Sequence, residues 1–388
     1  MSLRTEEESA AMTAARIMEG FADRTGLGHG SDAATRYLWT DAFALCIFLE
    51  LHARTGNGRY RDLAYRLIDQ VHATLGRFRT DDPRNGWISG LDDAEGQRSP
   101  TAGGLRIGKP LPERRPEEPF DDRLEWERDG QYFHYLTRWM HALARAARAL
   151  EQPVYLRWAM ELAAVAFDGF ARRDADGEVA GLYWKMNTDL SRPQVPSMGL
   201  HDALDGLLSF SDLQRIADEF QEMTAAPPLD DRTDALARLC RGRDWTTDDP
   251  LGLGGLLCDA ARAAQLSEWG APLEPELLPR LLDGCTRGLR LYRAGRPLEQ
   301  PAAHRLAFRE LGLAIGLSAL PLIARRLEDG PTGPRDTLSV LDGDSELADD
   351  IVRFWLSGAA QRAASWDAHR EINEVMLATA LVPDTYLN

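Results

Sequence analysis

The spacing of apolar residues predicts helices along almost the whole chain. From Tyr60 to Val71 apolar residues recur every three or four positions, and Arg and Asp fill the opposite side, which is typical of an amphipathic helix. The segment before it, residues 38–51, is apolar nearly all round, as expected for a helix covered on most sides. We therefore predict a hairpin made of one buried and one amphipathic helix, joined by a short glycine-containing turn.

The same hairpin pattern recurs along the chain. An N-terminal helix at 6–23 is the expected partner of the sixth buried helix, so that the two chain ends close a ring. The sequence thus predicts an all-α fold, with residues 1–388 forming a single domain of six hairpins. The buried helices are expected at 38–51, 129–150, 197–210, 249–265, 302–320 and 366–381, and the amphipathic ones at 60–71, after Pro153, and at about 211–223, 275–293 and 345–360.

A long connection interrupts this pattern at residues 78–128. It is rich in Pro, Gly and acidic residues and far exceeds the usual four to six residues of a connection. We expect it to fold over the mouth of a central funnel and to bring Trp126, Arg106 or Lys109 to a ligand.

Overlaying the six buried helices places four of the eight histidines at one repeat position. The equivalent residues are Trp39, His134, His201, Gly254, His304 and His369. Histidine both takes and gives a proton near neutral pH. The third and sixth buried helices are three hairpins apart, hence opposite across a ring. We therefore predict His201 and His369 as a proton-transfer pair, with His304 as the competitor of His369 and His134 as a binding residue.

Composition and short motifs exclude several classes of protein. The formal charge of −16 disfavours nucleic-acid binding. Neither a membrane-spanning run nor a secretory signal is predicted, so a cytoplasmic protein without a membrane partner is expected. Four isolated cysteines suggest reduced thiols. No metal-ligand spacing or dinucleotide motif is present, so neither metal nor cofactor is expected, and the sequence gives no oligomeric state.

The six hairpins resemble the (α/α)6 toroid of six-hairpin glycosidases and of the N-acylglucosamine and cellobiose 2-epimerase family. The resemblance rests on Arg36 in RYLW, on His201, and on a late His-Arg followed by acidic residues, as in His304-Arg305 and His369-Arg370. It differs at His201, where Asp205 follows at an offset of four and the family has Glu at three. It implies an inner ring of helices around a sugar-binding funnel, with Arg36 on a substrate oxygen and Glu371 or Glu374 orienting a histidine.

The resemblance implies a carbohydrate-active enzyme, most simply a sugar epimerase or isomerase that uses histidine acid/base chemistry on a small sugar. A glycoside hydrolase or lyase with paired carboxylates is the alternative, and a non-catalytic helical binding protein is a third. Asp41, inside an apolar helix, is the carboxylate hardest to explain structurally, and Asp205 is a further binding candidate. Aromatic side chains near the helix starts offer flat faces for a sugar ring. The aromatic candidates are Trp39, Trp126, Trp184 and Trp366.

Overall fold

The computed structural model describes residues 3–28, 35–115, 117–220, 226–328, 332–342 and 345–387. It is 65% helical with a few short strands, so the predicted all-α class is confirmed. The chain divides into two compact units, described separately below. Unit 2 is Ala22–Arg241, and unit 1 is Met1–Phe21 with Gly242–Asn388.

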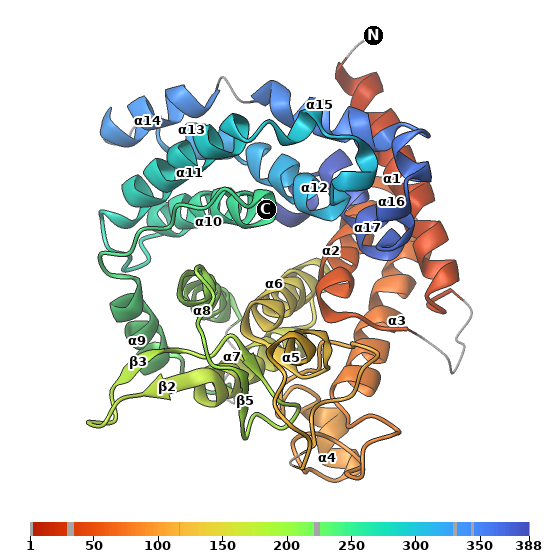
Figure 1. Cartoon of the computed structure of the whole chain (residues 1–388), viewed down its shortest axis with the longest axis vertical. Coiled ribbons are helices and arrows are strands. Elements are labelled where there is room, and N and C mark those ends of the chain that lie inside the picture. Colours follow the sequence, from red (N-terminus) through yellow and green to blue (C-terminus); the bar gives the residue numbers. More distant parts are fainter. Residues whose placement is uncertain are drawn as a thin grey trace. The chain divides into compact units, whose positions relative to one another are not determined.

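Unit 2 contains three hairpins in which an inner helix packs on the outer helix that follows it. The middle inner helix, α6, also packs against the two other inner helices, α2 and α8 (Figure 1). The unit therefore has the inner-and-outer arrangement that an (α/α)6 fold requires. The inner helices are α2 (Leu38–Thr55), α6 (Phe133–Ala149) and α8 (Asp202–Glu219), and the outer ones are α3 (Gly58–Leu75), α7 (Pro153–Phe170) and α9 (Asp230–Cys240).

Unit 1 repeats the arrangement, with α12 packed between α10 and α17 and with α11 and α15 on their outer side. The N-terminal helix α1 (Leu3–Arg24) belongs to this unit through residue 21 (Figure 1). The remaining helices are α10 (Pro250–Glu268), α11 (Leu277–Ala294), α12 (Ala307–Leu317), α13 (Leu320–Arg326), α14 (Thr332–Asp342), α15 (Ser345–Leu356), α16 (Ala364–Asp367), α17 (Arg370–Leu381) and α18 (Asp384–Leu387).

One local expectation was wrong. The helix expected at 211–223 is the second half of α8, whose buried face continues through Leu213 and Ile216, and the outer helix comes later as α9. The helix expected at 345–360 is present as α15, and two helices that were not expected, α13 and α14, precede it. The sequence also gave no sign of two small antiparallel sheets, β2–β3 and β1–β4–β5. Their strands are β1 (Gln131–Tyr132), β2 (Ala171–Arg173), β3 (Val179–Leu182), β4 (Lys185–Met186) and β5 (Pro193–Val195).

One helical stretch, Ala307–Arg326, is long and apolar enough by length and composition to cross a membrane. This differs from the expectation of no such run. Because 72% of its apolar window is buried inside the structure, it has the character of a core helix. Core helices of globular proteins meet the same test, so the stretch is weak evidence for a membrane span.

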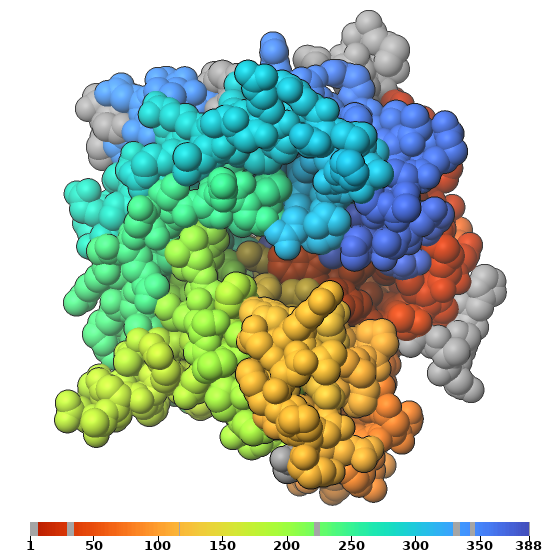
Figure 2. Space-filling model, viewed as in Figure 1, coloured from red at the N-terminus to blue at the C-terminus, as the bar shows by residue number. Residues whose placement is uncertain are grey.

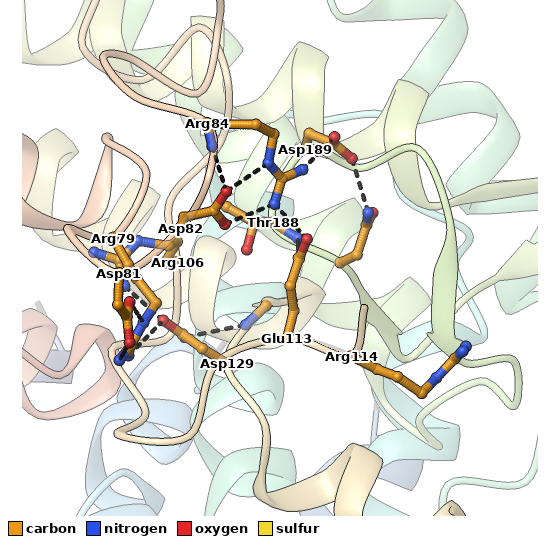
Figure 3. A network of polar contacts seen from close by, with 12 residues as sticks. Arg79, Asp81, Asp82, Arg84, Arg106, Glu113, Arg114, Asp129, Thr188 and Asp189 are labelled. Atoms are coloured by element: carbon orange, nitrogen blue, oxygen red, sulfur yellow. Dashed lines mark hydrogen bonds and ion pairs between the residues drawn. The ribbon is translucent and has the colours of Figure 1, made fainter. Parts of the chain in front are cut away.

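The 78–128 segment is anchored to the body of unit 2. It contains α4 (Asp93–Arg98) and α5 (Asp122–Glu127), and it forms a contiguous orange mass beside the yellow-green part of the same unit (Figure 2). Arg84 is its main anchor, because the guanidinium contacts Asp82 at 2.8 Å, Asp189 at 2.6 Å and the carboxylate of Glu113 (Figure 3). The other oxygen of Glu113 accepts a hydrogen bond from the Thr188 backbone at 2.6 Å. The network therefore joins two parts of the segment to the loop between β4 and β5.

A second anchor is the buried pair of Arg106 and Asp129, at 2.5 Å (Figure 3). Arg106 also donates to the carbonyls of Arg77 and Thr74, and the other Asp129 oxygen accepts from three backbone N–H groups. These bonds occupy the charged groups of both side chains. Arg106 and Asp129 thus fix the segment in place, whereas the sequence had suggested Arg106 as a ligand-binding residue.

We predict that Arg84→Gln loosens the 78–128 segment while the helices of unit 2 stay folded. Three partly exposed ion pairs are lost, each worth less than about 1 kcal/mol, so amide hydrogen exchange in the segment and at Thr188 should become about tenfold faster. Arg115→Gln, an exposed change in the same segment, is the matched control. Unchanged exchange in the Arg84 variant would contradict the anchoring role.

Candidate functional site

Seven aromatic side chains of unit 2 form one continuous cluster at the starts of α2 and α6. The hydroxyls of Tyr37 and Tyr135 lie 2.7 Å apart, and the Tyr135 ring packs against Trp39 at 5.3 Å between centroids. The cluster continues through rings 4.9–6.2 Å apart to α5 and the loop before β4. We call it the aromatic cluster, and its members are Tyr37, Trp39, Trp126, Tyr132, His134, Tyr135 and Trp184.

The backbone at two helix starts explains this arrangement. Tyr37 and Tyr132 are the N-cap residues of α2 and α6, both with extended dihedral angles. A further aromatic residue follows each of these tyrosines on the first turn of its helix: Trp39 follows Tyr37 on α2, and Tyr135 follows Tyr132 on α6. Because α2 and α6 pack side by side, their first turns bring these rings together.

His134 faces a carboxylate across the α6–α8 contact. Its Nδ1 lies 3.5 Å from Oδ1 of Asp202, whose other oxygen accepts from the Gly199 backbone at 3.1 Å. No described residue makes a hydrogen bond to this buried Nδ1. The His134 side chain is 24% exposed, so part of the ring remains open to a ligand. A carboxylate at this distance can orient an imidazole once the contact tightens on ligand binding.

A second contact lies one helical turn further along both helices. Arg138, four residues after His134, contacts Asp205 at 2.9 Å, and Asp205 lies four residues after His201. The Arg138 guanidinium also lies 5.7 Å from the centre of the Trp39 ring. Two adjacent turns of α6 therefore face two adjacent turns of α8, with the His134–Asp202 approach on one and the Arg138–Asp205 ion pair on the other. His201 is the half-buried N-cap residue of α8, next to Asp202.

Trp39 contributes a second buried polar atom without a partner. Its Nε1 makes no hydrogen bond to any described residue, although its side chain is nearly buried. A buried donor without an acceptor is unfavourable by about 1–3 kcal/mol. The aromatic cluster thus holds two unsatisfied polar atoms, Trp39 Nε1 and His134 Nδ1, which is typical of a site that a polar ligand completes.

Arg36 and Asp41 lie buried against each other at the start of α2. Their side chains are 3.2 Å apart, and Asp41 also accepts a hydrogen bond from the Tyr37 backbone at 3.0 Å. Burial raises the pKa of Asp41 to about 6, although Arg36 and the Tyr37 N–H oppose the shift. The sequence suggested Asp41 as a catalytic group and Arg36 as a binding group. In the structure the pair holds the helix start that carries Tyr37 and Trp39.

Both lysines of the chain lie beside the aromatic cluster. Lys109 Nζ donates to the carbonyl of Trp126, and Lys185 Nζ donates to the carbonyls of Glu125 and Arg128. Both ammonium groups also lie over the Tyr132 ring, at 5.6 and 5.2 Å. They bind the carbonyl end of α5, where cations are favoured, and so fix the helix that carries Trp126. Burial, with Lys109 nearby, lowers the pKa of Lys185 to about 7.

The other predicted residues lie in unit 1. His369 is the exposed N-cap residue of α17, with its ring 5.5 Å from that of Phe308. Glu371 and Glu374 follow on α17, and Glu374 lies 4.0 Å from Arg370. Trp366 is buried and stacks on Trp355, a core position. His304 ends the short 3-10 helix Ala302–His304 and lines a cavity of this unit.

The predicted repeat position is only partly kept. Trp39 and His134 are the second residues of their helices, and His201 and His369 are N-cap residues. Gly254 is instead the fifth residue of α10, and His304 lies three residues before α12. Sequence reasoning also missed Tyr135 and Arg138. The i, i+4 spacing of His134 with Arg138 and of His201 with Asp205 was the available signal.

Among the residues that the structure describes, no group of three or more His, Cys, Asp or Glu side chains is placed to hold a metal ion.

We predict that Lys185 makes the folded protein more stable as the pH rises above about 7. Its pKa is lowered in the folded state, so between about pH 7 and 10 the unfolded chain binds more protons and the free energy of unfolding rises with pH. Urea unfolding at pH 7 and pH 9 should show a smaller rise for Lys185→Met than for the wild type. The exposed change Arg123→Met on α5 is the control, and equal slopes in Lys185→Met and wild type would refute the prediction.

Comparison with known proteins gives structural similarities alone. No protein-family model and no curated protein sequence matches the chain. A cellobiose 2-epimerase from Spirochaeta thermophila is similar in structure, with a TM-score of 0.48 and 14% identity over 91% of this chain and 87% of that chain. A sugar epimerase from a ruminal bacterium is similar with a TM-score of 0.43 and 10% identity over 80% of this chain and 75% of that chain. Both of these proteins are epimerases by name.

Proposed function

We propose that the chain is a carbohydrate-active enzyme of the sugar epimerase or isomerase type, with His134 as an acid/base group. The contact of His134 with Asp202 beside the aromatic cluster carries the proposal. A histidine whose Nδ1 lies 3.5 Å from a buried carboxylate is suited to moving a proton once that contact tightens, and its partly exposed ring lies among flat aromatic faces. This assigns His134 a larger role than the binding role that the sequence suggested.

The aromatic cluster suits a sugar ring. Tryptophan and tyrosine rings pack against the C–H faces of a sugar, while their N–H and O–H groups bind its hydroxyls. Trp39 Nε1 is one such donor, and the half-buried rings of Trp126 and Trp184 supply apolar faces. Asp205 is committed to Arg138, so the pair supports the site by fixing the Trp39 face.

Epimerisation beside a carbonyl needs two proton-transfer groups. One takes the proton from the carbon next to the carbonyl of the open-chain sugar, leaving an enediolate, and the other returns a proton on the opposite face. We assign the first role to His134. His201, next to Asp202 at the start of α8, is the candidate for the second role, and it lies in the same unit.

A glycoside hydrolase remains the alternative because α8 begins with two buried carboxylates, Asp202 and Asp205. Hydrolysis requires two carboxylic groups that both reach the substrate. Asp205 is engaged by Arg138 at 2.9 Å, so it is less available than that mechanism requires. A non-catalytic sugar-binding protein would use the same aromatic faces without any turnover.

We predict that His134→Asn lowers turnover by about 10²- to 10⁴-fold without changing the melting temperature, because it removes a proton-transfer group. Asp202→Asn should lower turnover as well, by releasing the imidazole. His141→Asn is the matched control, since His141 lies two turns further along α6. His201→Asn then tests the second proton-transfer group, and His369→Asn tests separately the role that the sequence predicted for His369.

The measurement is product formation from cellobiose, N-acetylglucosamine and glucose, followed by NMR. Full activity of His134→Asn would contradict the assignment. Hydrolysis that survives the histidine changes and is lost in Asp202→Asn or Asp41→Asn would favour the hydrolase. Binding of these sugars without turnover would favour the binding protein.

A further inference from the structure

We propose that unit 1 carries a binding pocket of its own for a small neutral polyhydroxylated ligand. The cavity has a volume of about 310 Å³ and is formed by the start of α10, the end of α11 and the start of α12. This volume lies at the lower end of the range of ligand pockets and suits a single sugar ring. The inference goes beyond the proposed function, because the pocket is lined by unit 1 residues alone and its occupation needs no turnover.

Tyr292, near the end of α11, is the observation that points to a ligand. It lines the cavity and is only 5% exposed, yet its hydroxyl makes no hydrogen bond to any described residue. Burial raises the pKa of Tyr292, so the hydroxyl stays protonated and remains a donor. A buried hydroxyl in a cavity wall is satisfied when a ligand supplies the missing partner.

A buried ion pair between Arg305 and Glu310 fixes another part of the cavity wall. Arg305 donates two hydrogen bonds to Glu310, at 2.7 and 2.5 Å, and Trp355 Nε1 donates to the same carboxylate at 2.8 Å. The Arg305 guanidinium also lies 3.9 Å from the centre of the Phe354 ring. Contacts with Trp355 and Phe354 thus hold both charged side chains in place, so the shape of this part of the pocket does not depend on the ligand.

The remaining lining groups determine the class of ligand. Arg305 is paired with Glu310 and Arg309 with Asp249, whereas no contact of the Asp248 carboxylate with a described residue is found. The local charge is therefore slightly negative, which disfavours an anion. Hydroxyls of a neutral ligand can donate to Asp248 and accept from Tyr292 and from the buried, unpartnered Nε of Arg309. The exposed side chains of Leu291 and Leu306 offer an apolar face for its C–H groups.

Methyl NMR of the full chain, labelled at leucine, tests the pocket. The probe is methyl α-D-glucopyranoside, a neutral sugar whose ring is locked and which therefore cannot be epimerised. We expect it to shift the methyl signals of Leu291 and Leu306 in a saturable way. Tyr292→Phe should weaken this binding about 3- to 10-fold, because one hydrogen bond is lost, with an unchanged or higher melting temperature. Tyr155→Phe, which removes a tyrosine hydroxyl in unit 2, should leave it unchanged.

Blocking and charge variants complete the test. Leu291→Trp should fill the pocket and abolish the shift of Leu306, whereas Leu356→Trp, a similar change at the end of α15, should not. Glucose 1-phosphate should bind more weakly than the neutral probe. Absence of shifts, no effect of Tyr292→Phe, or tighter binding of the phosphate would each overturn the proposal. Turnover is not part of this readout, so such a failure would leave the proposed function standing, and an inactive enzyme that still binds here would leave the pocket standing.

Discussion

A buried arginine paired with a carboxylate fixes the starts of inner helices in both units. Arg36 pairs with Asp41 at the start of α2, Arg138 with Asp205 between α6 and α8, and Arg305 with Glu310 at the start of α12. A charge buried without a partner costs several kcal/mol, so each guanidinium and its carboxylate must stay together in the folded chain. The helix starts, and the aromatic side chains on them, therefore have little freedom to move.

The arrangement of the candidate site follows from one of these pairs. Because Arg138 must meet Asp205, the preceding turns of α6 and α8 are held side by side, and His134 reaches Asp202. The Arg138 guanidinium also lies over the Trp39 ring. This contact connects α2, whose start is held by Arg36 and Asp41, to the same cluster. On the other side the two lysines fix α5 and hence Trp126. The unsatisfied atoms of Trp39 and His134 are thus held in a rigid setting, as a site requires that must orient a small substrate.

The sequence predicted the helices well because each helix is encoded by the spacing of its own apolar residues. It did not predict that α8 continues through residues 211–219. The prediction divided this stretch into two helices, whereas the apolar spacing continues through it as one. The site was predicted in part. Histidines and tryptophans stood out by type, but the contact of His134 with Asp202 joins residues far apart in the chain and cannot be deduced from spacing.

The buried ion pairs align the starts of α2 and α12 better than the histidine positions do. Arg36 with Asp41 and Arg305 with Glu310 share a spacing of five residues, with the arginine before the helix and the acid in its first turns. This alignment puts Phe308, rather than His304, at the place of Trp39. His304 accordingly lies before α12, on the cavity of unit 1.

Solvent exchange at carbon reports directly on the proton transfer that we assign to His134. The protein is incubated in D₂O with cellobiose, N-acetylglucosamine or glucose, and the carbon next to the carbonyl is followed by NMR. We expect deuterium to enter at that carbon with the wild type and with His141→Asn, and we expect His134→Asn to slow the exchange by about 10²- to 10⁴-fold. Epimerisation without deuterium incorporation, or exchange at the full rate in His134→Asn, would contradict this assignment.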